Sequence, residues 1–212
     1  MAPTAHCTSD YMQAKAREVH VPPVLQDLRA GTAELHIALE KRLPFFSDTL
    51  DLRAFERLMR AYYGFYQPLE AALRDSGALP ADFDLDSRLK APTLQRDLQA
   101  LGANGTDFSD CRQLPVIDSA AAALGVLYVL EGATLGGQIL RREIAARLGL
   151  GADNGAAFLD IYGAATGRRW RDFIEYLGCR PMDTDEREAV VAAAHTTFSC
   201  FERWLESQEV LV

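Results

Sequence analysis

Apolar residues recur at helical spacing along almost the whole chain after residue 22, and no segment of the sequence shows the alternation typical of a β-strand. The clearest stretch is 52–76, with apolar or aromatic residues at 55, 58, 59, 62, 65, 66, 69 and 73. Pro68 lies inside this stretch and is expected to kink the helix. We therefore expect an all-α protein with a single helical domain.

Proline, glycine and capping residues set the ends of the other expected helices. Asp183, with Glu186 three residues later, forms the capping-box pattern of a helix start. Besides 52–76, helices are expected over 24–41, 87–101, 118–148, 156–176 and 183–209, with a glycine interruption in the 118–148 helix. Residues 1–22 show no sustained period and are expected to form a flexible N-terminal arm, which leaves 23–212 as the helical domain.

Composition and charge narrow the class of protein. The 212 residues are 49% hydrophobic and 25% charged, and their net charge of −8 argues against a nucleic-acid partner. The four cysteines, at 7, 111, 179 and 200, lack the close spacing of a zinc or redox motif. We expect reduced thiols, a cytoplasmic location, no signal peptide and no segment long and apolar enough to span a membrane.

One histidine stands out on the first expected helix, where residues 29, 32, 36, 39 and 40 share a side. A neutral imidazole at His36 can bind a metal through one nitrogen while the other faces an acceptor such as Glu40. Arg29 lies two turns earlier, about 10 Å along the axis. This spacing suits a ligand with a metal centre and an anionic edge. A packed or surface histidine, with Arg29 and Glu40 on a solvated helix face, is the other interpretation of the same pattern.

Glycines are unusually frequent in the apolar 118–148 helix. Gly125, Gly132 and Gly136 share a face, and Gly137 lies beside them. Each glycine inside a helix costs about 1 kcal/mol relative to alanine, so their clustering needs a cause. Either another helix packs very closely against them, or a bulky planar ligand lies against bare backbone.

The two segments resemble those of heme oxygenases. The pattern Leu-Lys/Arg-x-x-Thr-x-x-x-His-x-x-x-Glu is matched by residues 28, 29, 32, 36 and 40, and Gly-x-x-x-Gly-Gly-Gln by residues 132, 136, 137 and 138. The run 128–137 resembles the bacterial branch, most closely the oxygenases associated with bacteriophytochromes. The implied fold is a single-domain helical bundle with heme held between a proximal and a kinked distal helix.

The resemblance also implies roles for particular residues. His36 would be the proximal iron ligand, Glu40 the hydrogen-bond partner of its ring, and Arg29 the contact of a heme propionate. Phe198 matches an aromatic residue of the last helix that lines the pocket. Gly132, Gly136 and Gly137 would let the distal helix bend over heme, and with His36 they are the expected catalytic residues.

The implied reaction uses heme as both substrate and cofactor. O2 and electrons from an external reductase or ferredoxin would convert heme to biliverdin, CO and ferrous iron, and a bacteriophytochrome is a possible recipient of biliverdin. Many members carry an aspartate after the first distal glycine, where this chain has Ala133. A non-catalytic protein of the same fold that binds or delivers heme is therefore the alternative.

Overall fold

The computed structural model describes residues 21–81, 83–103 and 108–212, and the described part contains six α-helices and no β-strand. The all-α expectation is confirmed. The expected N-terminal arm lies almost wholly outside the described residues, because only Val21 and Pro22 of it are described. The helices are α1 (Pro23–Arg42), α2 (Leu52–Asp75), α3 (Ala91–Ala100), α4 (Ala120–Leu148), α5 (Thr166–Gly178) and α6 (Thr184–Ser207), and short 3-10 turns lie in the connections α1–α2, α2–α3 and α4–α5.

The starts of three helices follow directly from local sequence. The Asp51 carboxylate accepts a hydrogen bond from the backbone N–H of Ala54 and begins α2. Ser119 caps α4 in the same way. At α6, Asp183 and Glu186 each accept a hydrogen bond from the other's backbone N–H, which confirms the expected capping box.

Helix α4 runs unbroken from Ala120 to Leu148. The expected interruption by glycine is therefore absent from this helix. It ends at Gly149, whose φ of +68° is the left-handed conformation typical of a glycine helix end. Within the described residues, α4 is long and apolar enough to cross a membrane by length and composition. The expectation that the chain has no segment of this length and hydropathy was therefore wrong. The helix nevertheless serves the protein core, because 56% of its most apolar window is buried.

Two expected helices are shorter than the apolar pattern indicated. The 87–101 segment divides into a 3-10 turn, Asp86–Arg88, and α3. The 156–176 segment divides into the turns η3 (Ala157–Asp160) and η4 (Gly163–Ala165) before α5 begins. Gly163 adopts a φ of +50°, a backbone conformation incompatible with a continuous helix.

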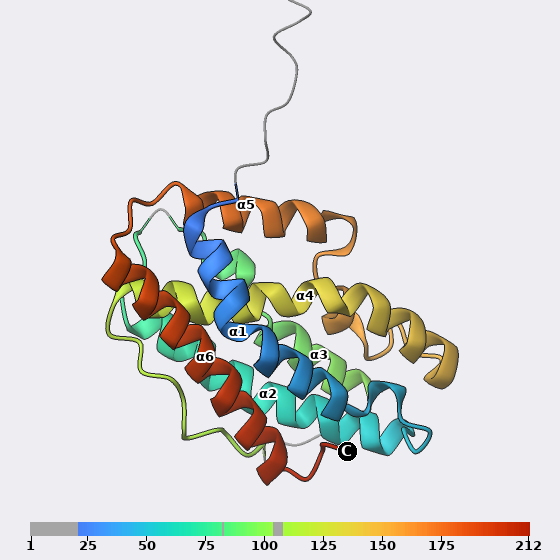
Figure 1. The fold of residues 1–212 in the computed structure, drawn as a ribbon. Helices are drawn as coiled ribbons and strands as arrows, with labels where there is room; N and C mark the ends of the chain where they lie inside the picture. Colours follow the sequence, from blue (N-terminus) through green and yellow to red (C-terminus); the bar gives the residue numbers. More distant parts are fainter. Residues whose placement is uncertain (1–20, 82, 104–107) are drawn as a thin grey trace, which may run out of the picture.

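The packing of α6 places α1 and α4 around a common space. Figure 1 shows α1 and α6 running side by side across α4, with α2 and α3 behind and α5 along one end. Buried apolar side chains from all six helices form one continuous core. The chain returns to α1 at its end, where the backbone N–H of Val212 donates to the carbonyl of Arg42 at 2.8 Å.

Candidate functional site

A cavity of about 740 Å³ lies between α1 and α4. Its volume is in the range of sites that hold a cofactor-sized ligand, and its lining is mostly apolar. All seven predicted binding residues are among the lining residues, six on α1 and α4 and one on α6: Arg29, His36, Glu40, Gly132, Gly136, Gly137 and Phe198. The fold thus brings together side chains that are up to 169 positions apart in sequence, the separation of Arg29 and Phe198.

His36 lies in the α1 wall with its side chain 52% exposed. Its Nδ1 is 3.5 Å from Oε2 of Glu40, one turn along the helix, which leaves Nε2 as the nitrogen for a ligand. The ring of Phe198 on α6 meets the imidazole edge-on, with 6.0 Å between ring centroids. His36 is therefore not a packed core histidine, since half of its side chain is accessible at the edge of an apolar cavity.

The other residues of α1 explain how His36 is positioned. Leu28 and Leu39 are buried in the core and anchor the helix there. Thr32 lies between them in sequence, and its hydroxyl donates to the carbonyl of Leu28 at 2.7 Å. Arg29 is exposed where α1 borders the cavity, which leaves its guanidinium accessible to an anionic group of a ligand.

The glycines of α4 satisfy both explanations that the sequence left open, at different positions. A Cβ at Gly125 would overlap the backbone of α6 at Val190, and one at Gly137 would overlap the carbonyl oxygen of Leu159. In contrast, a Cβ at Gly136 meets no described atom within 4 Å, and one at Gly132 reaches only Trp170, at 3.8 Å. Two glycines allow close packing, and the other two leave backbone bare along the cavity.

Aromatic residues that the sequence analysis did not assign to the site form part of its wall. Tyr62 and Tyr66 of α2 have parallel rings with centroids 6.0 Å apart, and both rings meet Phe158 and Phe201 edge-on. Desolvation raises the pKa of both tyrosines, so they remain neutral. Their helical spacing on α2 marked them only as core residues.

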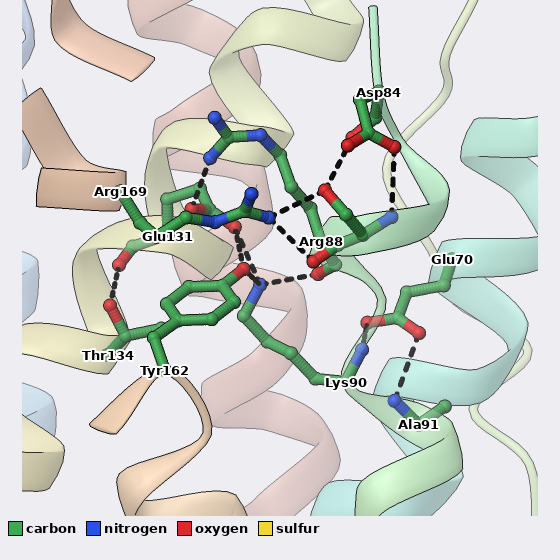
Figure 2. Close-up of polar contacts among 10 residues, drawn as sticks. Glu70, Asp84, Arg88, Lys90, Ala91, Glu131, Thr134, Tyr162 and Arg169 are labelled. Atoms are coloured by element: carbon green, nitrogen blue, oxygen red, sulfur yellow. Dashed lines mark hydrogen bonds and ion pairs between the residues drawn. The ribbon is translucent and has the colours of Figure 1, made fainter. Parts of the chain in front are cut away.

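A charged cluster behind α4 was also missed. Figure 2 shows the Glu131 carboxylate surrounded by Arg88 and Lys90, from the segment just before α3, and by Tyr162, which lies between η3 and η4. Glu131 and Lys90 are each 1% exposed, and Lys90 lies in the cavity wall. The one signal in the sequence was a carboxylate inside the apolar run 122–135, because a buried charge requires a partner.

The fold and the cavity define a class of all-helical protein with a mostly apolar, cofactor-sized cavity between two helices. A family model described as heme oxygenase matches residues 23–207, and the chain therefore belongs to the heme oxygenase family. It is a heme-degrading enzyme of this family.

Two bacterial relatives agree with this assignment. The chain is 25% identical over 159 residues to a heme oxygenase of Xanthomonas campestris pv. campestris, covering 75% of this chain and 93% of the relative. It is 28% identical over 181 residues to the heme oxygenase PigA of Pseudomonas aeruginosa, covering 85% and 90%.

Solved structures share the fold. The heme oxygenase of Neisseria meningitidis superimposes with a TM-score of 0.71 at 21% identity, covering 89% of this chain and 93% of that one. The heme oxygenase of Leptospira interrogans gives a TM-score of 0.72 at 20% identity, covering 87% and 98%. Heme oxygenase-1 of Synechocystis, solved in complex with heme, gives 0.63 at 20% identity, covering 88% and 92%.

Proposed function

We propose that this enzyme binds heme in the cavity between α1 and α4 and cleaves it with O2 and external electrons to biliverdin, CO and ferrous iron. The observation that carries the proposal is the pairing of one accessible imidazole, His36, with the bare backbone of Gly132 and Gly136 in the same cavity. One wall then supplies an iron ligand, and the other leaves space for a planar macrocycle.

The groups present fit heme in both shape and chemistry. In the proposed arrangement Nε2 of His36 binds the iron, and Glu40 orients the imidazole through Nδ1. Arg29 meets a propionate, and Phe198 packs against the imidazole edge. Bound heme supplies the iron at which O2 is reduced, and the protein contributes orientation and water exclusion.

Gly132, Gly136 and Gly137 act differently in this proposal. Gly132 and Gly136 keep α4 free of side chains that would occupy the macrocycle's space. Gly137 lets the Leu159 backbone pack against α4 and so fixes the helix position. Whether α4 also bends over heme stays a prediction of the family resemblance.

Electrons must reach the cavity from another protein. The sequence carries no flavin or dinucleotide fingerprint, and the described residues contain no group of three His, Cys, Asp or Glu side chains that could hold a metal ion. We propose a reductase or a ferredoxin as the donor. The described cysteines are free thiols, which agrees with the proposed cytoplasmic location.

We further propose that the biliverdin is supplied to a bacteriophytochrome. The support is the resemblance of the run 128–137 to the bacteriophytochrome-associated branch. The test is to mix the enzyme, heme and a reductant with a bacteriophytochrome apoprotein and to measure the red-absorbing chromoprotein. A chromophore yield no greater than that obtained with free biliverdin would argue against direct supply.

Aerobic turnover separates the enzyme from the heme-delivery alternative. With heme, O2 and a reductant, we expect the heme absorption to be replaced by that of biliverdin, with release of CO. Recovery of unaltered heme from a stable O2 complex would support the delivery protein instead. Ala133 motivates that alternative, because its methyl group cannot order water as an aspartate would.

A further inference from the structure

The cluster behind α4 has a defined hydrogen-bond geometry. The Glu131 carboxylate accepts from Nη1 of Arg88 at 2.6 Å, from Nζ of Lys90 at 2.7 Å and from the Tyr162 hydroxyl at 2.9 Å. The Lys90 ammonium also donates to the carbonyl of Arg88 at 2.8 Å and lies 3.4 Å from the Tyr162 hydroxyl. Each charged group in the cluster is paired.

Such a cluster needs a cause beyond stability. Burying two cations and one carboxylate carries a desolvation penalty that often equals or exceeds the Coulombic gain. The backbone of Lys90 is itself fixed, because the Glu70 carboxylate accepts from the N–H of Lys90 at 2.7 Å and of Ala91 at 3.0 Å. The ammonium is therefore held in place from two directions.

The cluster adjoins the cavity. Lys90 is part of the cavity wall, and Glu131 directly precedes Gly132 on α4. The neighbouring Tyr66 also lines the cavity, and Glu70, Glu131 and Tyr162 lie near enough to contribute to the raised pKa of its hydroxyl, after desolvation. Next to this wall, Ala133 offers no polar side chain.

The cluster also continues to the protein surface. The guanidinium of Arg169 lies over the ring of Tyr162, 4.8 Å from its centroid. It donates to the carbonyl and the hydroxyl of Ser87, at 2.6 Å and 2.7 Å, and Ser87 is exposed. Figure 2 shows Asp84, Arg169, Tyr162, Glu131 and Lys90 in this line of polar groups, and Ser87 contacts Asp84 through its backbone N–H and its hydroxyl.

We propose that Lys90, held by Glu131 and Tyr162, places a fixed positive charge beside the cavity face formed by α4 and so makes water bound there easier to deprotonate. This water would occupy the side of heme on which many family members use an aspartate in place of Ala133. The inference rests on the proposed function of the cavity. The charged or titratable groups around Lys90 are Glu131 of α4, Arg88 of the 3-10 turn Asp86–Arg88, Tyr162 between η3 and η4, and Glu70 of α2. Tyr66 of α2 lies near Glu70, Glu131 and Tyr162.

Charge substitution gives a test with opposite signs. The ferric heme complex is titrated with alkali, and the midpoint of the absorption change reports proton loss from water on the α4 side. Lys90→Met removes a positive charge and is expected to raise the midpoint by about half a pH unit or more. Glu131→Gln removes a negative charge at the same shape and is expected to lower it by a similar amount, whereas Lys90→Arg restores a midpoint near that of the wild type.

A matched control separates local from general effects. Lys41 is an exposed lysine of α1 that forms no ion pair with a described residue, so Lys41→Met makes the same chemical change outside the cavity. Two results would overturn the inference. In the first, Lys90→Met and Glu131→Gln leave the midpoint unchanged, as Lys41→Met is expected to do. In the second, both variants shift the midpoint in the same direction. If Lys90→Met does not fold, the midpoint of the isosteric Glu131→Gln variant decides alone.

The same titrations test the role of Lys90 separately from the proposed binding of heme in the cavity. A wild-type protein that forms no histidine-ligated heme complex contradicts the proposed site itself. A normal histidine-ligated complex with unmoved midpoints in the variants contradicts only the role of Lys90.

Discussion

Gly136 and Gly137 are neighbours on α4 with opposite surroundings. The Cβ position of Gly137 is filled by the carbonyl oxygen of Leu159, whereas a Cβ at Gly136 would meet no described atom within 4 Å. One residue therefore serves packing and the other leaves open the side of the helix that faces the cavity. Substitution by alanine can distinguish these two uses of glycine.

Gly137→Ala is expected to destabilise the apoprotein by about 2 kcal/mol or more, because backbone must move to admit a methyl group. Gly136→Ala is expected to leave the free energy of unfolding unchanged or raise it by up to about 1 kcal/mol, through helix propensity, while weakening heme binding. Urea unfolding and heme titration of both variants make the measurement. Equal loss of stability in the two variants would contradict this division.

Gly125 provides a packing site away from the cavity. A Cβ there would overlap the Val190 carbonyl and lie 2.8 Å from the Cβ of Ala193 on α6. Gly125→Ala is expected to cost about 2 kcal/mol or more in thermal or urea unfolding. Any residual folded protein should bind heme as tightly as the wild type, and a selective loss of heme affinity at normal stability would refute the assignment.

Glu40 is expected to act on heme and not on the stability of the fold. Its side chain is 58% exposed and its ion pair with His36 is open to solvent, so Glu40→Gln should change the free energy of unfolding by less than about 1 kcal/mol. Loss of the partner of a metal-binding imidazole typically costs about 10-fold or more in affinity. Heme titration beside urea unfolding tests this, and unchanged heme affinity would argue against Glu40 as the partner of the ring.

Glu70 gives the protein a predictable pH response. Burial raises its pKa above the ordinary 4.5, despite two backbone hydrogen bonds that lower it. The native state therefore holds this proton more tightly than the unfolded chain does. The resulting stabilisation is fully present below the unfolded pKa and is lost as pH rises through the folded pKa.

The variant Glu70→Gln isolates that contribution because glutamine does not titrate. The free energy of unfolding of the wild type minus that of the variant should fall as pH rises from about pH 4 towards about pH 7. Urea unfolding at a series of pH values measures this difference. A difference that stays constant or rises with pH would contradict the raised pKa.

The predictable parts of the fold were those with local causes. The capping box at Asp183 and Glu186 lies within four residues and was confirmed, as was the apolar face of α2. The break before α5 was not foreseen, because apolar spacing continues through Gly163 while its backbone conformation does not. The spacing of apolar residues cannot predict that one residue within the pattern adopts a positive φ.

The site divides in the same way. Family resemblance, and not periodicity, placed Phe198 with His36 from 162 positions away, and the cavity brings them together. The contact of Lys90 with Glu131 joins two segments that no sequence motif relates. Only the isolated carboxylate of Glu131 in an apolar run indicated that a buried partner was needed. The contact of Arg169 with the Tyr162 ring likewise depends on tertiary packing.

The central claim is that the imidazole of His36 binds the heme iron, and heme titration of His36→Ala tests it most directly. His195→Ala on α6 is the matched control, because that histidine is exposed and does not line the cavity. We predict that only His36→Ala loses the histidine-ligated absorption spectrum, and that added imidazole restores it. A histidine-ligated spectrum that persists in His36→Ala without imidazole would contradict the account.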